Sequence, residues 1–186
     1  KTGLRSKRLS EGHAPAAKTY GSTVRRGSCE SSRRDAKTTM IDVNRHNQSS
    51  WDEQSAAGAS PWVKPVNSED IKAARAGECH IILTPIKAVP KSWLGDLRDK
   101  DLLCLASGGG QQAPILAAAG AVVTSFDQSS EQLRKDAEVA AHNNLSIRCV
   151  QGDMADLSIF EDASFDLIVH PVSNIFAPEI IPVWQH

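Results

Sequence analysis

The sequence predicts an α/β fold with a doubly wound, mostly parallel sheet, and three observations support this prediction. Four short apolar runs after Lys100 are separated by helical or turn patterns. Each run is almost continuously apolar, as expected for strands buried on both faces of a parallel sheet. Three glycines follow the first run, at the point where such a sheet has its ligand crevice. We therefore expect right-handed βαβ units.

The elements of this sheet follow from the apolar periodicity. We expect strands over residues 102–106, 121–126, 147–150 and 165–169. We expect helices over 111–119, 130–143 and 178–185, and a short helical piece over 155–160. The predicted apolar face of the helix over 130–143 consists of Leu133, Ala137, Ala140 and Ala141.

Residues 40–99 form a lead-in to the sheet, and residues 1–39 a segment of different composition. The lead-in is predicted to contain a helix over 47–57, an extended linker at Pro61 and Pro65, a helix over 68–77, a β-like run over 79–83 and a helical turn over 92–95. Residues 1–39 hold ten Lys and Arg against three acidic residues, whereas the remainder holds 11 against 19. Because residues 1–39 have few large apolar side chains and no periodicity, we predict a disordered tail or upstream extension, with Met40 as a candidate native start.

Composition excludes several classes of protein. The 186 residues suffice for one domain, and no run of eighteen apolar residues predicts a membrane span. The four cysteines are far apart and the six histidines form no HxxxH or HxH pair, so we expect reduced thiols, a cytoplasmic protein and no metal site. A basic tail can bind nucleic acid, but the acidic remainder opposes such binding.

Polar residues follow the first three predicted strands at their carboxyl ends. The glycines of Ser107–Gly110 let the backbone pass under a ligand, although a tight turn explains the same pattern. Asp127 is placed to accept hydrogen bonds from ribose hydroxyls, although a solvated loop aspartate also fits. Asp153 and Met154 suit the amine and ring face of an adenine, or else a helix cap and a core methionine. Together these features favour an adenosine-containing ligand.

These motifs resemble those of the class I S-adenosylmethionine-dependent methyltransferases, and the resemblance covers residues 90–186. It looks closest to the bacterial small-molecule type, and the stretch 44–48 with Trp51 resembles the N-terminal cap helix of some such enzymes. The resemblance implies a Rossmann-like fold, S-adenosylmethionine as cofactor and methyl transfer to a small-molecule acceptor. The cofactor-binding residues that it implies are Ala106, Ser107, Gly108, Gly109, Gly110, Asp127, Gln128, Asp153, Met154 and His170.

Two positions depart from the family pattern. Cys104 occupies the place of an acid that orients the methionine ammonium, and Ala106 that of the first loop glycine. Gly108 and Gly110 fall on matching positions, so we expect the loop to form. The backbone carbonyls of Ala106 and His170, or a group of the cap helix, are candidates to hold the ammonium instead.

The segment His170–Phe176 follows the fourth strand and, by resemblance, faces the transferred methyl group. It matches only one proline of the motif shared by amino-directed DNA and glutamine methyltransferases, so we do not expect a nucleic-acid acceptor. His170 is a candidate general base, or a residue that only shapes the pocket. Asn174 is a candidate to orient the acceptor, or a turn cap.

Two alternative functions remain open on the sequence alone. An NAD(P)-binding Rossmann oxidoreductase shares the glycine turn and Asp127, but Gly152–Met154 and the lack of a Tyr-x-x-x-Lys pair count against it. A non-catalytic nucleotide-binding module fits the departures at Cys104 and Ala106. The family's sheet continues beyond its fourth strand, so we expect residues 100–186 to form a C-terminally incomplete domain of low stability and little turnover. The sequence does not predict an oligomeric state.

Overall fold

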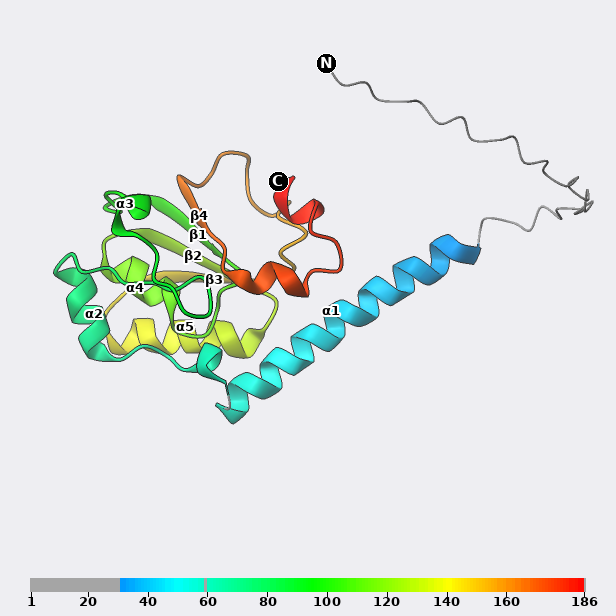
Figure 1. The fold of residues 1–186 in the computed structure, drawn as a ribbon, viewed down its shortest axis with the longest axis horizontal. Helices are drawn as coiled ribbons and strands as arrows, with labels where there is room; N and C mark the ends of the chain where they lie inside the picture. The colour runs from blue at the N-terminus through cyan, green and yellow to red at the C-terminus, as the bar shows by residue number, and fades with distance from the viewer. Residues whose placement is uncertain (1–30, 59, 186) are drawn as a thin grey trace, which may run out of the picture.

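One parallel sheet forms the centre of the protein. The computed structural model describes residues 31–58 and 60–185, so most of the predicted basic tail lies outside the described residues. The strand order is β3-β2-β1-β4 (Figure 1), and every neighbouring pair is parallel. The strands are β1 Asp101–Leu105, β2 Val122–Asp127, β3 Ile147–Gln151 and β4 Leu167–Val169. The predicted Rossmann-like α/β fold is confirmed, and each strand lies within two residues of its predicted bounds.

The strand register brings the carboxyl ends of the strands together. Leu105 pairs with Phe126, and Asp127 pairs with Gln151. The strand order reverses at β1, because the chain moves outward to β3 and then returns to place β4 on the other side of β1. Such a reversal opens a crevice at the carboxyl ends of the strands.

Helices cover one face of the sheet and irregular segments cover the other. On the helical face, α4 Gln112–Ala118 and α5 Ser130–His142 pack on the sheet, and α2 Ser68–Arg75 packs on α4 (Figure 1). On the opposite face, Leu103, Leu105 and Phe126 pack against Leu157 and Val183. That face is covered by the turns after β3 and by the 3-10 helix η3 Pro182–Trp184, while the 3-10 helix η2 Val172–Phe176 follows β4 at the end of the sheet.

A long helix precedes the sheet. Helix α1 spans Ser31–Ala57, and its C-terminal half packs against α5 (Figure 1). It therefore begins well before the predicted residue 47 and includes residues 31–39, which composition had placed outside the folded part. The 3-10 helix η1 Pro61–Val63 and the one-turn helix α3 Lys91–Leu94 complete the lead-in.

Four sequence predictions are wrong in detail. Residues 79–83 form no strand, because Ile82 makes only an isolated bridge to Ala88. Residues 155–160 form turns, and the helix expected over 178–185 is reduced to η3. On α5, Ala137 and Ala141 are exposed, because polar side chains occupy much of the buried face.

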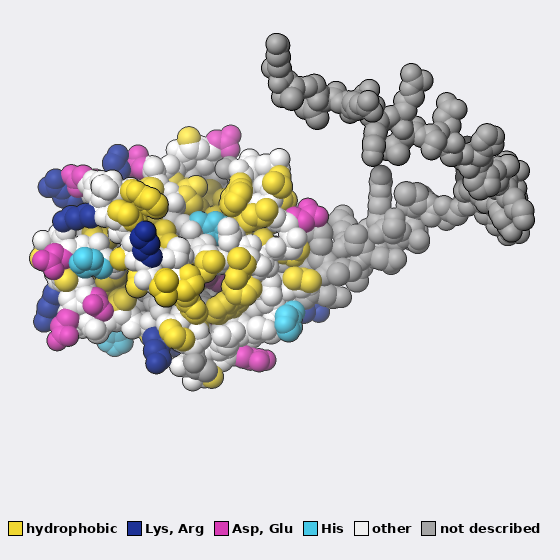
Figure 2. Space-filling model, viewed as in Figure 1, with side chains coloured by type: hydrophobic (Ala, Val, Ile, Leu, Met, Phe, Trp, Pro, Cys, Tyr) yellow, Lys and Arg dark blue, Asp and Glu magenta, His cyan; other side chains and the backbone are white. Residues whose placement is uncertain are grey.

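Several large apolar side chains are exposed at the surface. Figure 2 shows hydrophobic side chains gathered on the viewed face, and the exposed large apolar residues include Ile86, Trp93, Ile175, Ile181 and Trp184. The three cysteines in the described part of the chain, Cys79, Cys104 and Cys149, are free thiols. Across residues 31–58 and 60–185, no helix combines the length and hydropathy of a membrane span.

Candidate functional site

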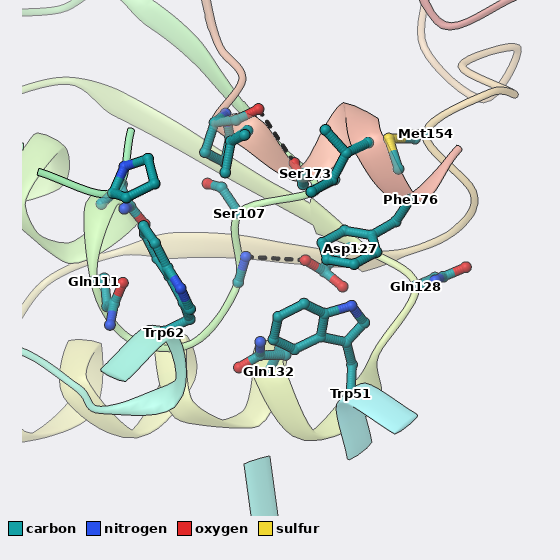
Figure 3. Close-up of a pocket in the computed structure, with 17 residues that line it drawn as sticks. Trp51, Trp62, Ser107, Gln111, Asp127, Gln128, Gln132, Met154, Ser173 and Phe176 are labelled. Carbon is teal, nitrogen blue, oxygen red and sulfur yellow. Dashed lines mark hydrogen bonds between the residues drawn. The ribbon is translucent and has the colours of Figure 1, made fainter. Parts of the chain in front are cut away.

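A cavity of about 260 Å³ opens at the carboxyl ends of β1, β2 and β4 (Figure 3). The glycine loop forms its floor, α1 and η1 contribute one wall, and the segment after β4 contributes another. Its lining residues include Trp51, Trp62, Ala106, Ser107, Gly108, Gln111, Gln112, Asp127, Gln128, Gln132, Met154, Val172, Ser173, Ile175 and Phe176. The predicted site residues of three separate strand ends therefore meet in one cavity.

The N–H groups of the three loop glycines all donate to acceptors inside the protein. Gly108 N–H donates to Asp127 Oδ2 at 3.0 Å, the bond drawn in Figure 3. Gly109 N–H donates to the carbonyl of Gln132 at 3.0 Å, and Gly110 N–H to Asp136 Oδ1 at 2.6 Å. None of these three donors is left for an anion in the cavity.

Space and backbone conformation explain the glycines. Gly109 and Gly110 have φ angles of +118° and +75°, which residues other than glycine rarely adopt. Gly108 has no such constraint, but a Cβ there would lie 2.8 Å from Cβ of Gln132. The loop lies so close to α5 that larger residues would not fit at these positions. Packing of the loop against α5 therefore requires small residues, in addition to any requirement from a ligand.

Asp127 connects the cavity to the loop and to the start of α5. Its Oδ1 accepts the N–H of Ser129 at 2.9 Å, while Oδ2 accepts that of Gly108. The side chain is buried, and this burial raises the pKa of its carboxyl. Each carboxylate oxygen has a second lone pair, so Asp127 can still accept a hydrogen bond from a ligand.

Asp136 on α5 is a functional candidate that the sequence reasoning missed. Besides Gly110 N–H, it accepts the hydroxyl of Ser125 at 2.6 Å, and its side chain is completely buried. Burial raises the pKa of this carboxyl to about 7. No sequence signal indicates this role, because apolar spacing on the helix assigns Asp136, next to Lys135, to solvent.

Helix α1 is fastened over the cavity by polar contacts to segments that follow β2, β3 and β4. Asp52 Oδ1 accepts the Ser129 hydroxyl at 2.6 Å, and Asn44 Nδ2 donates to Asp153 Oδ2 at 2.6 Å. Asn47 Nδ2 donates to the carbonyl of Phe176 at 2.9 Å. The indole of Trp51 meets the ring of Phe176 edge-on, with centroids 5.4 Å apart.

The proline-rich segment 61–66 forms a strap beside the loop rather than a free linker. Gln111 Nε2 donates to the carbonyls of Pro61 and Lys64 at 2.7 and 2.9 Å. Val66 N–H donates to the carbonyl of Gly110 at 2.8 Å. The strap directs Trp62 into the cavity (Figure 3), a role that the sequence analysis did not predict.

Of the other predicted cofactor-binding residues, some line the cavity and some do not. Gln128 and Met154 line it, whereas Gly109 and Gly110 lie behind its wall. Asp153 does not line it, since Oδ2 faces Asn44 and Oδ1 accepts the N–H of Ala155 at 3.0 Å.

Neither residue proposed for catalysis lines the cavity, although its wall includes Pro171, Val172 and Ser173 between them. His170 follows β4; its Nε2 is buried and has no hydrogen-bond partner among the described residues. Burial lowers the pKa of His170, so its ring is neutral near pH 7. Asn174 lies within η2.

The cavity has little charge. Among the described residues, its lining contains no Lys, Arg or His, and Asp127 is the ionisable side chain there. In the described part of the chain, no group of three or more His, Cys, Asp or Glu is placed to hold a metal ion. The wall is otherwise rich in apolar and aromatic side chains, which suit the uncharged parts of a ligand.

Comparison with known proteins matches part of this chain to a methyltransferase domain. The family model described as a methyltransferase domain matches residues 103–179. The uncharacterized methyltransferase YbaJ of Bacillus subtilis is 47% identical over 140 residues, which are 75% of this chain and 54% of that protein. This chain thus spans about half the length of that relative.

Two solved structures among the matches bear related descriptions. A putative S-adenosyl-L-methionine-dependent methyltransferase from Methanococcus maripaludis is 20% identical, with a TM-score of 0.48 over 77% of this chain and 57% of that one. Phosphoethanolamine N-methyltransferase 1 from Haemonchus contortus is 21% identical, with a TM-score of 0.47 over 69% of this chain and 25% of that one. The sequence-based resemblance is confirmed by the family and sequence matches.

Proposed function

We propose that this chain binds S-adenosylmethionine in the cavity and transfers the methyl group to a small-molecule acceptor, which the match of residues 103–179 to a methyltransferase domain and the similarity to the Bacillus relative support. The observation that carries the proposal is the direction of the glycine N–H groups. A dinucleotide's pyrophosphate needs free N–H donors at this turn. Here all three glycine donors are used, two of them by carboxylates, so the loop suits a cationic ligand and the oxidoreductase alternative is not favoured.

The lining residues support a division of the cavity between the two halves of the cofactor. Asp127, Gln128 and Met154 suit the adenosine, with Asp127 accepting from ribose hydroxyls and the Met154 thioether covering the ring. Asp153 does not line the cavity, and we propose that it acts on the adenosine end through its hydrogen bond with Asn44 of α1. The loop residues Ala106, Ser107 and Gly108, together with Trp62, suit the methionine part.

The proposed mechanism assigns to the protein mainly alignment and exclusion of water. When bound, S-adenosylmethionine supplies a methyl group that is already activated by a sulfonium. Trp51, Trp62 and Phe176 give the cavity an apolar wall that keeps water from the acceptor. His170, neutral near pH 7, is proposed to accept a proton where the acceptor loses one, and Asn174 to orient the acceptor.

A second cavity supports a small acceptor. It has a volume of about 350 Å³ and shares Trp62, Pro85, Gln111 and Gln112 with the first cavity. This shared wall places a further ligand-sized space directly beside the proposed methionine end. We also propose a bacterial, cytoplasmic protein, which the Bacillus relative and the free thiols support.

Calorimetric titration tests the cofactor assignment. We expect S-adenosylmethionine and S-adenosylhomocysteine to bind the wild type, and Asp127→Ala to weaken both by about ten- to a hundredfold, because a buried charged acceptor is lost. The exposed Asp162→Ala is the matched control and should bind like the wild type. Circular dichroism checks that each variant is folded. Binding of NADH without binding of either sulfur nucleotide would contradict the proposal.

A further inference from the structure

Asp136 lies behind the glycine loop and has no part in the mechanism proposed above. We propose that the negative charge of Asp136 favours a cationic ligand in the cavity, so that S-adenosylmethionine binds more tightly when this carboxyl is ionised. In this role Asp136 is a positioning and electrostatic residue, because it does not line the cavity. The proposal rests on the proposed function and adds a pH dependence to it.

The geometry isolates this carboxyl from water and from any cation. Its two oxygens accept Gly110 N–H and the Ser125 hydroxyl, each at 2.6 Å, and the side chain is 0% exposed. Both donors are neutral, and no ion pair with Asp136 is formed among the described residues. A buried charge that no cation neutralises extends its field into a low-dielectric neighbourhood, here the loop and the cavity above it.

The surrounding titratable groups do not cancel this charge. Asp127 on β2 adds a second carboxyl, and Cys104 on β1 and Cys149 on β3 are the thiols affected by Asp136. Burial raises the pKa of both thiols, so they stay neutral at physiological pH. On α5 itself, Lys135 forms no ion pair with Asp136, and its Nζ instead donates to the carbonyl of Val63 at 2.5 Å.

The direction of the pH effect follows from the charge. Burial and Asp127 raise the pKa of Asp136 to about 7, while the hydrogen bonds from Ser125 and Gly110 oppose this shift. A cationic ligand stabilises the ionised carboxyl, so binding must release a proton below this pKa. The affinity for the cation therefore rises with pH through neutrality, whereas the affinity for a neutral ligand stays level.

The test compares two ligands and two proteins by calorimetry between about pH 6 and about pH 8. S-adenosylmethionine carries a net positive charge, and 5′-methylthioadenosine is its neutral counterpart with the same adenosine. In Asp136→Asn the amide can keep both hydrogen bonds, by accepting from Gly110 N–H and donating to the Ser125 oxygen. Other titratable groups, including Asp127 and His170, are present in both proteins. Their effects on the affinity therefore cancel when the pH profiles of the two proteins are compared.

We expect S-adenosylmethionine to bind the wild type about five- to tenfold more tightly at the upper pH, and Asp136→Asn to bind it weakly with no such rise. Methylthioadenosine should bind both proteins equally. As a second variant, Ser125→Ala removes a donor that lowers the pKa of Asp136, so the rise should move to higher pH.

Four results would overturn the proposal or the function on which it rests. Equal pH profiles of the wild type and Asp136→Asn for S-adenosylmethionine would exclude an effect of the charge. Equal weakening of both ligands in Asp136→Asn would indicate a purely structural role in holding the loop. A wild type that binds neither ligand would contradict the proposed function itself, whereas binding of both without pH dependence would contradict this proposal alone.

Discussion

Gly152, between β3 and Asp153, is a position where one methyl group should disturb both the core and the site. A Cβ there would lie 2.4 Å from Cζ and 2.6 Å from Cε2 of Phe126, whereas ordinary contact begins near 3.4 Å. Gly152 is not among the residues with a positive φ, so alanine would not strain the backbone. The cost of Gly152→Ala is therefore steric alone, and it falls on Phe126.

The structure indicates how large this cost should be. Phe126 is 1% exposed and packs with Leu103, Leu105 and the ring of Phe160, whose centroid lies 5.4 Å away. The ring has no open space to move into, and overpacking of this kind costs about 1–3 kcal/mol. For a domain of this size we expect Tm to fall by about 3–10 °C.

Thermal unfolding followed by circular dichroism measures this effect, and a second substitution tests its cause. Phe126→Leu removes the ring atoms that the new methyl would meet, so Gly152→Ala should cost at least about 1 kcal/mol less in that background. Gly77→Ala, with φ at +89° and nothing within 4 Å, is a control for backbone strain without overlap. A Tm within about 1 °C of the wild type for Gly152→Ala, or an equal cost in both backgrounds, would refute the reasoning.

Two further predictions concern α5 and α1. Because the pKa of Asp136 is raised to about 7 in the folded state, folding binds a proton between about pH 4 and about pH 7, and stability is lost as pH rises through this range. Asp136→Asn should therefore be more stable than the wild type at pH 8. In urea unfolding, the difference in free energy of unfolding between the two proteins should be about 2–3 kcal/mol smaller at pH 5 than at pH 8. A difference that does not change with pH would contradict this prediction. Trp51→Ala should lose about 1 kcal/mol of stability and weaken S-adenosylhomocysteine binding, because the edge contact with Phe176 closes the cavity wall. Trp93→Ala, on a side chain 74% exposed, should change neither quantity, and equal effects of the two substitutions would argue against a role for Trp51.

The strands could be predicted because their signal is local. Residues such as Leu102, Leu103 and Val123 are buried in the sheet, and continuous apolar runs record this burial directly. The run over 79–83 has the same composition but no partner strand beyond one bridge, and composition alone does not distinguish the two cases.

The buried face of α5 could not be predicted, because its residues serve distant backbone groups. Asp136 is buried where it accepts the N–H of Gly110, and Lys135 is buried where it donates to the carbonyl of Val63. Apolar periodicity assigns such polar side chains to the solvent-exposed face. Ala137 was assigned to the core by the same rule and is exposed. Long-range hydrogen bonds between side chain and backbone leave no trace in apolar spacing.

Some residues of the candidate site could be predicted from local sequence, whereas others are placed by contacts between distant segments. Asp127 and Met154 were found because a residue after a parallel strand must lie at the crevice. Trp62 enters the cavity only because Gln111 holds the strap, a contact between segments far apart in sequence. Asn44 was noted by resemblance, but its hydrogen bond to Asp153 required the packing of α1 on the sheet.

A crystal structure of this protein with S-adenosylhomocysteine would test the central claim most directly. The account predicts the nucleoside in the cavity with its ribose hydroxyls at the Asp127 carboxylate, and the N–H groups of Gly108, Gly109 and Gly110 still bonded to Asp127, Gln132 and Asp136. A ligand bound outside this cavity would contradict the account. So would a loop whose glycine N–H groups turn toward the ligand.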